Sequence, residues 1–488
     1  MRSSDDAVVA GWLSGLDLPH LRRKLLTWYA RHQRDLPWRR TRDPYAIWVS
    51  EVMLQQTRVE TVRERWPLFL ARFPDVGSLA RAREQSVLKA WEGLGYYRRA
   101  RALRAAARAV AAEHGGALPR TYDELLALPG FGPYTAAAVA SIAHERPHAV
   151  VDGNVARVLA RLLALDDDPR TSAGKRRWQL VADALMARRR PGDWNQAVME
   201  LGATVCVPRT PRCDLCPWGR VCRGRHMGDP ERYPRRAARR EIPHHDIAAG
   251  LVWRKGELLI ARRPSEGLLG GLWEFPGGKR QPGESLEEAV VRELREETGL
   301  RVRVEAPFVS IDHAYSHFRI TLHLFHCRVV GGRAAPKASE ELRWIVPSDL
   351  DRHPFPRANR KAIDQLLVEG PPRWAGQRVP PGAVDPLHSG ADALRRAPGD
   401  EMAESRTLEI DIPEGADVRR LLAAAKAKAA GVGITLDGDA DQGRFEGIAA
   451  GSWAVSDGKL VVTVEKKPAF APWPMVMSQL EKAFRQGI

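Results

Sequence analysis

The stretch YDELLALPGFGPYTAAAVASIA, residues 122–143, decides the fold of the first half of the chain. Apolar residues recur at helical spacing on both sides of LPGFGPYTA, residues 128–136, which predicts two helices joined by a tight turn. Gly130 and Gly132 permit that turn and expose backbone N–H groups, and the following helix adds the positive end of its dipole. These features predict a helix–hairpin–helix motif that binds phosphate groups irrespective of base sequence. An ordinary helical hairpin is the alternative for this stretch taken alone.

The block around this hairpin, about residues 20–225, is predicted to be helical nearly throughout. Apolar residues recur every three to four positions in the segments 20–31, 46–71, 84–92, 99–113, 122–128, 134–143 and 153–164.

Near the end of this block, four of the five cysteines follow the spacing C-x6-C-x2-C-x5-C, and they are Cys206, Cys213, Cys216 and Cys222. Four thiolates so close together can bind one metal centre, either Zn²⁺ or a [4Fe–4S] cluster. Zinc sites usually pair two C-x2-C units, and only one is present, so the spacing favours the [4Fe–4S] cluster. A disulfide is not expected, because nothing marks the chain as secreted.

Composition indicates a nucleic-acid partner. The 488 residues carry a formal net charge of +16, which is typical of DNA- or RNA-binding proteins. The sequence contains no apolar run of about 18 residues and no secretory pattern at its start, so a membrane span is not expected. We therefore expect a cytoplasmic, nucleoid-associated monomer.

Several segments resemble the helix–hairpin–helix DNA glycosylase superfamily and, within it, the MutY-type adenine glycosylases. They follow the family's order across residues 25–225, and they are LPWR (36–39), WVSEVMLQQT (48–57), GLGYYRRAR (93–101), LPGFGPYTA (128–136), VDGNVARVLAR (151–161) and the cysteine cluster. The resemblance implies removal of adenine mispaired with 8-oxoguanine from double-stranded DNA. It also implies that the cluster has a structural role in a DNA-binding loop.

Two carboxylates are candidates for the chemistry. Breaking the bond between adenine and its sugar needs an acid, and it needs an ionised carboxylate that stabilises the oxocarbenium sugar. Glu51 lies in an apolar helix, where desolvation would raise its pKa toward that of a general acid. Asp152 lies at a predicted helix start, where backbone amides favour the ionised form, and the resemblance places the catalytic aspartate there. A plain helix cap and a satisfied core carboxylate are the respective alternatives for Asp152 and Glu51.

Within the resembled superfamily, the residue at position 134 separates monofunctional glycosylases from lyases. Related lyases of the endonuclease III kind carry a lysine at this position of the hairpin, and its amine forms a Schiff base with the sugar. A tyrosine cannot form one, so the resemblance implies a monofunctional glycosylase in which Tyr134 supports the charged intermediate. Gln55 and Tyr96 match residues that wedge into the duplex, although core packing is the alternative for Tyr96. The predicted DNA contacts are completed by Gly130, Gly132 and Thr135.

A second domain is predicted from alternating strands around one long helix. GGKRQPGESLEEAVVRELREETGL, residues 277–300, matches a complete Nudix box. Glu293, Glu296 and Glu297 share one helix face, where Mg²⁺ would offset their mutual repulsion. A solvated acidic face relieved by the neighbouring arginines is the alternative.

This complete box departs from the resembled family, in which the box is typically degraded and the domain recognises 8-oxoguanine without hydrolysing anything. HAYSHF, residues 313–318, resembles the recognition loop of that domain, and Ser316 and His317 are its candidate lesion-reading residues. An alternative function is therefore a bifunctional protein that also hydrolyses oxidised nucleoside triphosphates. A DNA-binding protein without turnover is a third possibility, against which the set of Glu51, Tyr134 and Asp152 argues.

The predicted fold class is a multi-domain one: an all-α glycosylase domain with an iron–sulfur loop, an α/β/α Nudix-like domain and a small α+β domain. The predicted boundaries are 1–225 for the first domain, 226–244 for a linker, 245–368 for the second domain, 369–404 for a flexible linker and 405–488 for an accessory module. For this last module, the pattern predicts the order β-α-β-β-β-α, with strands over 407–412, 432–437, 443–450 and 459–465.

Overall fold

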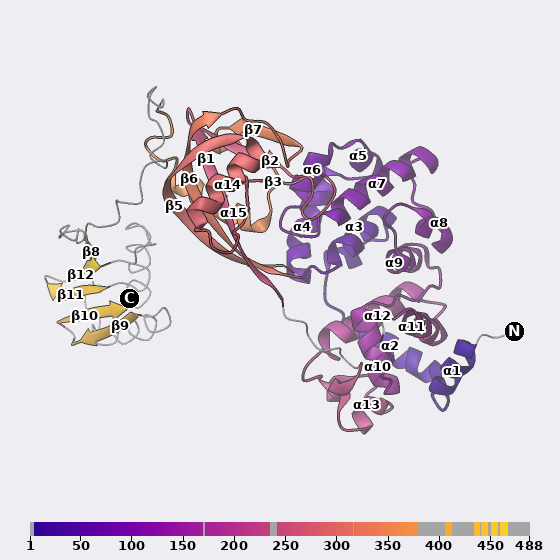
Figure 1. Cartoon of the computed structure of the whole chain (residues 1–488). Helices are drawn as coiled ribbons and strands as arrows, with labels where there is room; N and C mark the ends of the chain where they lie inside the picture. Colours follow the sequence, from indigo (N-terminus) through magenta and orange to yellow (C-terminus); the bar gives the residue numbers. More distant parts are fainter. Residues whose placement is uncertain are drawn as a thin grey trace. The chain divides into compact units, whose positions relative to one another are not determined.

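The computed structural model describes residues 4–168, 171–234, 242–315, 317–377, 406–411, 434–439, 441–447, 450–456 and 459–466 (Figure 1). The chain divides into two compact units, residues 1–380 and 381–488. The predicted fold class is confirmed: a helical region is followed by a Nudix-like domain with a mixed sheet and by a small antiparallel sheet. The predicted domain boundaries stay predictions.

The first part of the larger unit is built from helices (Figure 1). They are α1 (Ser4–Leu13), α2 (Leu18–His32), α3 (Pro44–Leu54), α4 (Val59–Arg72), α5 (Val76–Arg81), α6 (Glu84–Ala90), α7 (Arg98–Glu113), α8 (Tyr122–Ala127), α9 (Pro133–His144), α10 (Gly153–Leu163), α11 (Ser172–Leu185), α12 (Pro191–Thr204) and α13 (Arg223–His226), with the short 3₁₀ turns η1 (Pro37–Arg39), η2 (Cys213–Leu215) and η3 (Pro230–Arg232).

The stretch 46–71, in which apolar residues recur at helical spacing, forms two helices, α3 and α4. The chain turns between them at Gln56, whose φ of 60° is left-handed. Apolar periodicity continues across this turn because both helices face the same core, so periodicity alone did not reveal the break.

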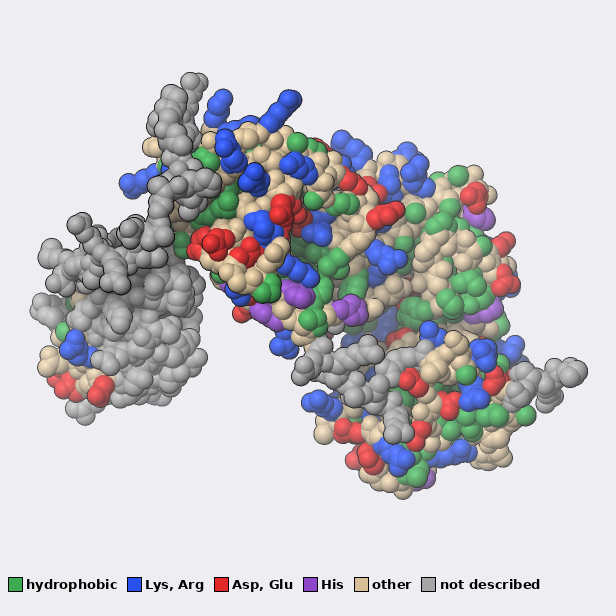
Figure 2. All heavy atoms as spheres, viewed as in Figure 1, with side chains coloured by type: hydrophobic (Ala, Val, Ile, Leu, Met, Phe, Trp, Pro, Cys, Tyr) green, Lys and Arg blue, Asp and Glu red, His purple; other side chains and the backbone are tan. Residues whose placement is uncertain are grey.

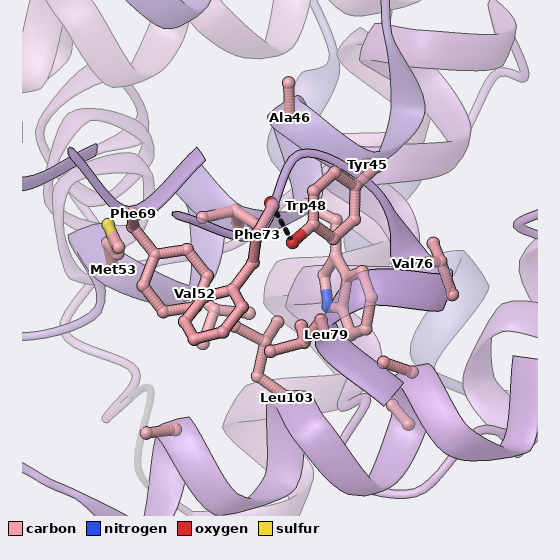
Figure 3. Packing of buried hydrophobic residues seen from close by; sticks show 14 of the residues in the cluster. Tyr45, Ala46, Trp48, Val52, Met53, Phe69, Phe73, Val76, Leu79 and Leu103 are labelled. Atoms are coloured by element: carbon pink, nitrogen blue, oxygen red, sulfur yellow. Dashed lines mark hydrogen bonds between the residues drawn. The ribbon is translucent and has the colours of Figure 1, made fainter. Parts of the chain in front are cut away.

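Two hydrophobic cores lie on either side of α3 and α9. One core is built mainly on α3 to α9 and includes Trp48, and the other packs α1, α2 and α10 to α12 together and includes Ile47. Figure 3 shows part of the first core, in which the hydroxyl of Tyr45 donates to the backbone oxygen of Phe73 at 2.9 Å. Since α3 and α9 contribute to both cores, side chains on them are held from two sides.

The Nudix-like domain contains a seven-stranded mixed sheet in the order β3-β2-β1-β6-β5, with β4 paired to β1 and β7 paired to β2. Only the β1–β6 pair is parallel among the pairings of this sheet in the described residues. Separate cores on the two faces include residues of α14 and α15, which gives an α/β/α arrangement. The elements are β1 (His244–Arg254), β2 (Glu257–Arg262), β3 (Trp273–Glu274), β4 (Gly277–Lys279), α14 (Leu286–Thr298), β5 (Leu300–Ala314), β6 (Arg319–Gly332), β7 (Glu341–Ile345), η4 (Pro347–Arg352) and α15 (Arg357–Glu369).

The helical region and the Nudix-like domain share part of one core. Leu272, which precedes β3, is fully buried among residues of the first helical core. Beside it, Gln85 on α6 donates to the backbone oxygen of Gly271 at 2.8 Å and accepts from Trp273 Nε1 at 2.9 Å. These contacts join the two regions by buried packing as well as by polar bonds.

The smaller unit contains a five-stranded antiparallel sheet in the order β8-β12-β11-β10-β9. Its strands are β8 (Arg406–Asp411), β9 (Ile434–Gly438), β10 (Gln442–Gly447), β11 (Ala450–Ser456) and β12 (Lys459–Lys466). The strand expected over 443–450 corresponds mainly to β10, and the predicted order lacks β11, which pairs antiparallel with β10. The two helices predicted for this module lie outside the described residues.

Candidate active site

Glu51 lies on α3 between the two helical cores, and its side chain is buried. Helix α3 begins where Asp43 caps the backbone N–H groups of Tyr45 and Ala46, with Pro44 in its first turn. Burial raises the pKa of Glu51 to about 7. A hydrogen bond from Tyr134 and the charge of Arg39 oppose this rise, whereas the nearby charge of Asp152 adds to it. The local environment therefore favours a carboxyl group that holds its proton near neutral pH.

Tyr134 comes from the first turn of α9, directly after the hairpin. Its hydroxyl donates to Glu51 Oε2 at 2.7 Å and lies 3.3 Å from Met199 Sδ on α12. Burial and the neighbouring carboxylates raise the pKa of Tyr134 well above its usual value, so the phenol stays protonated and acts as a donor. The structure thus brings together two predicted site residues that lie 83 positions apart in the chain.

Asp152 caps the N-terminus of α10. Its Oδ1 accepts from the backbone N–H of Val155 at 2.7 Å, and its Oδ2 accepts from Asn154 Nδ2 at 3.3 Å. The amides were expected to favour ionisation, but burial outweighs them and raises the pKa of Asp152. Arg157, one turn further along α10, lowers this pKa again through its charge. Asp152 both caps α10 and interacts electrostatically with Glu51. Its role as a helix cap therefore does not exclude a role in the chemistry.

Arg157 also connects Asp152 to the cysteine loop. Its guanidinium donates to Asn154 Oδ1 at 2.7 Å, to the backbone oxygen of Gly202 at 2.8 Å and to that of Cys206 at 2.9 Å. Since Asn154 itself donates to Asp152, a continuous chain of hydrogen bonds runs from the first cysteine to this aspartate.

Sequence reasoning did not identify another buried carboxylate, that of Glu200. Glu200 on α12 accepts two hydrogen bonds from the side chain of Arg34, at 2.8 and 2.9 Å, and one from Arg39 at 2.8 Å. Burial opposes the ionisation of Glu200, but these bonds outweigh it and lower its pKa to about 2. Arg39 therefore lies near two buried carboxyl groups with opposite pKa shifts. The sequence pointed to this cluster only through the LPWR segment, residues 36–39, which contains Arg39.

The hairpin and the predicted wedge residues lie near this site. Gln55 ends α3 and donates to the hydroxyl of the buried Thr135 at 3.0 Å. Gly130 has a φ of 75°, and a Cβ there would lie 2.5 Å from Ala102 Cβ, so the turn requires glycine. Gly132 has an extended φ of −105° and open space around it, so the turn does not require glycine there. Tyr96 is 40 % exposed, in contrast to the buried Tyr97 beside it.

A cleft of about 730 Å³ is lined by both regions of the larger unit. Gln55, Tyr96 and Gly130 line it from the helical region, and Tyr315 and His317 line it from the tip of the β5–β6 hairpin. His317 is exposed, and Tyr315 stacks on Phe318 with ring centroids 4.7 Å apart. Ser316 lies outside the described residues. Figure 2 shows Lys and Arg side chains spread over the visible face of this unit, with acidic side chains between them.

The four clustered cysteines border one small cavity, together with Arg161 and Arg225. All four carry free thiols, and Arg161 donates to the backbone oxygens of Val207 and Pro208 and lies 3.4 Å from Cys206 Sγ. Four sulfur donors and two guanidinium groups around one cavity have the chemistry that suits an anionic, thiolate-bound cluster. Among the described residues, no group of three or more His, Cys, Asp and Glu side chains is arranged to hold a single metal ion. Cluster binding stays a prediction.

The Nudix box folds as the β4 strand and α14. Arg292 pairs with Glu284 at 2.6 Å, with Glu293 at 2.8 Å and with Glu296 at 3.2 Å. Glu297 accepts from the backbone N–H of Gly277 at 3.1 Å, and burial together with the charge of Glu274 raises its pKa to about 7. Arginine pairing thus relieves much of the predicted repulsion between the glutamates. The Mg²⁺ site stays a prediction.

Comparison with known proteins gives the family. The model of the HhH-GPD superfamily of base excision DNA repair proteins matches residues 49–182, and the NUDIX domain model matches residues 248–365. The adenine DNA glycosylase of Homo sapiens is 35% identical over 413 residues, covering 73% of this chain and 76% of that protein. The chain belongs to the adenine DNA glycosylase family. The family's Rattus norvegicus member is 37% identical over 384 residues, covering 68% of this chain and 74% of that protein.

A bacterial member of the adenine DNA glycosylase family, from Mycolicibacterium smegmatis, is 44% identical over 208 residues, which are 42% of this chain and 70% of that protein. Family membership confirms the resemblance stated from the sequence, and it does not favour the alternative hydrolysis of oxidised nucleotides. No helix in the described parts of the chain is long and apolar enough to cross a membrane.

The buried Glu200 gives a prediction about stability. Glu200→Gln should lower the free energy of unfolding by about 3 kcal/mol at pH 7, because Arg34 and Arg39 lose a desolvated counter-charge. Since the pKa of Glu200 is lowered in the fold, the charge contributes fully above pH 4.5, and its contribution is lost as the pH falls toward about 2. Denaturant unfolding measured across pH checks this. Asp35→Asn, in a solvent-exposed pair with Arg40, is the control and should leave the free energy of unfolding nearly unchanged, because water screens that pair.

Proposed function

We propose that this chain removes adenine from double-stranded DNA where adenine is paired with 8-oxoguanine, as a monofunctional glycosylase. The observation that carries the proposal is the 2.7 Å hydrogen bond between Tyr134 and Glu51 in a buried site that also includes Asp152. It supplies a proton donor and a carboxylate in one place, which is the pair that cleavage of a glycosidic bond requires. Family membership supports the same substrate class.

In the proposed reaction, Glu51 donates its proton to a ring nitrogen of adenine. The bond from the sugar to the base then breaks, and its electron pair leaves with the neutral base. The carboxylate of Asp152 stabilises the oxocarbenium sugar, and hydrogen bonds from Val155 and Asn154 support its ionised form. Water then adds to the sugar carbon and gives up one proton to the Glu51 carboxylate, which completes the hydrolysis and restores the acid. Tyr134 has no amine and therefore leaves the sugar–phosphate strand intact.

DNA is the proposed partner of the cleft between the helical region and the β5–β6 hairpin. The backbone N–H of Gly132, the N-cap of α9, would bind a phosphate group, and Gln55 and Tyr96 would fill the space that the extruded adenine leaves. His317 faces the same cleft and would read the 8-oxoguanine. Binding to chromosomal DNA accounts for the proposed location at the nucleoid.

The four cysteines are proposed to hold a [4Fe–4S] cluster with a structural role. When bound, the cluster would fix the loop between α12 and α13. Hydrogen bonds from Arg157 and Arg161 would connect that loop to α10. Mg²⁺ at Glu293, Glu296 and Glu297 would compete with Arg292, which engages two of these side chains.

The first test concerns the acid. Glu51→Gln should abolish adenine release from an 8-oxoguanine·adenine duplex while leaving duplex affinity within about twofold, because the amide keeps the shape but has no proton to donate. For the native chain, the single-turnover rate should fall as the pH rises through about 7, where Glu51 loses its proton. Quenched-flow measurements of released adenine check both points. A rate near that of the native chain for Glu51→Gln would exclude this assignment.

The second test concerns the cluster. Purified protein should show the broad brown absorbance of a [4Fe–4S] cluster, whereas a zinc protein would be colourless. Cys213→Ser should lower iron content and duplex affinity together, measured by iron assay and fluorescence anisotropy. Cys327→Ala is the matched control, because this fifth cysteine lies buried in the Nudix-like domain, and it should leave both quantities unchanged. An active, colourless protein containing zinc would contradict the cluster.

The third test concerns lesion recognition. His317→Ala should reduce the preference for 8-oxoguanine·adenine over guanine·adenine pairs by about tenfold, which corresponds to the loss of about one hydrogen bond. Single-turnover rates on the two duplexes give this ratio. His114→Ala removes an exposed histidine outside the cleft and should not change it. An unchanged ratio for His317→Ala would assign lesion reading to other residues.

A further inference from the structure

Two residues that line the cleft region have strained backbone conformations. Gln56 has a φ of 60° and Tyr96 a φ of 48°, and both are non-glycine residues in the left-handed region. Strain of this kind persists only where the surrounding structure imposes it. Gln56 directly follows Gln55, so both proposed wedge residues lie at strained turns.

One side chain connects the two turns. The guanidinium of Arg99, in the first turn of α7, donates to atoms of both the end of α3 and the turn before Tyr96. Its acceptors are the backbone oxygens of Val52 at 2.8 Å, Met53 at 2.9 Å and Gln55, the hydroxyl of Thr57 at 2.9 Å, and the backbone oxygens of Leu94 at 2.9 Å and Gly95 at 3.0 Å.

The aromatic side chains around Arg99 complete this arrangement. Its guanidinium lies 5.5 Å from the ring centre of Tyr96 and 5.4 Å from that of Trp91, so it contacts the proposed wedge residue itself. Among the described residues, no carboxylate pairs with Arg99. The negative end of the α3 dipole, presented by the carbonyls of its last turn, takes the place of a counter-ion.

We propose that Arg99 is a positioning residue that locks the end of α3 and the Tyr96 turn into one unit, so that Gln55 and Tyr96 enter the duplex together when adenine is extruded. The inference rests on the proposed function, since it assigns Arg99 to the extrusion step of that reaction. Arg99 does not touch the reacting atoms. A planar guanidinium suits this task because Nη1 donates to the end of α3 while Nη2 donates to the turn before Tyr96, whereas an ammonium presents all its N–H groups from one atom.

The test separates extrusion from chemistry. Arg99→Met and Arg99→Lys are compared with the native chain on a duplex carrying 2-aminopurine opposite 8-oxoguanine, because the fluorescence of this adenine analogue rises when it leaves the base stack. Single-turnover adenine release is measured in parallel across pH. Arg108→Met is the control, since Arg108 is exposed on the same helix and does not line the cleft. Thermal midpoints of all variants identify any that fail to fold.

Both Arg99 variants should lose most of the fluorescence rise at saturating protein, and adenine release should slow by at least about tenfold with the pH midpoint unchanged. Native behaviour of Arg99→Lys would overturn the inference, because charge alone would then suffice. A full fluorescence rise in Arg99→Met with slow release would also overturn it, since Arg99 would then act on the chemical step. If the native chain extruded 2-aminopurine but released no adenine, the proposed function would fail, while the fluorescence of the variants would still decide the role of Arg99.

Discussion

The hydrogen bond between Tyr134 and Glu51 joins the two helices on which the rest of the site depends. Helix α3 supplies Ile47 to one core and Trp48 to the other, and α9 likewise contributes to both. A donor and an acceptor on such doubly packed helices meet without relying on a mobile loop. The buried contact therefore also defines where Gln55 and the hairpin lie, because both are continuous with these helices.

Burial alone does not decide how a carboxyl group behaves in this protein. Glu51 and Glu200 are both buried, yet burial raises the pKa of Glu51 to about 7, whereas Arg34 and Arg39 lower that of Glu200 to about 2. The difference lies in the partners, since a neutral phenol contacts one group and two guanidinium groups contact the other. Arg39 donates to Glu200 and affects Glu51 only at longer range, so a nearby cation does not force Glu51 to ionise.

The sequence allowed prediction of features that depend on residues close together in the chain. Glycine at position 130 and the apolar repeats around it indicated the hairpin, and an apolar helix around Glu51 indicated a raised pKa. Contacts between distant segments left no periodic signal, so the engagement of Glu200 by Arg34 and the bridging by Arg99 were not foreseen. The raised pKa of Asp152 was also not foreseen. The position at a helix start indicated the backbone amides that lower this pKa, but the sequence did not indicate the desolvation that outweighs them.

The shared core at Leu272 limits how far the chain can be treated as modular. A leucine from the Nudix-like domain fills space inside the helical region, so separating the two would leave a cavity in one and an exposed apolar side chain on the other. An evolutionary exchange of either region with a relative would need matching changes around α6 and β3, so the two regions are constrained to diverge as a pair.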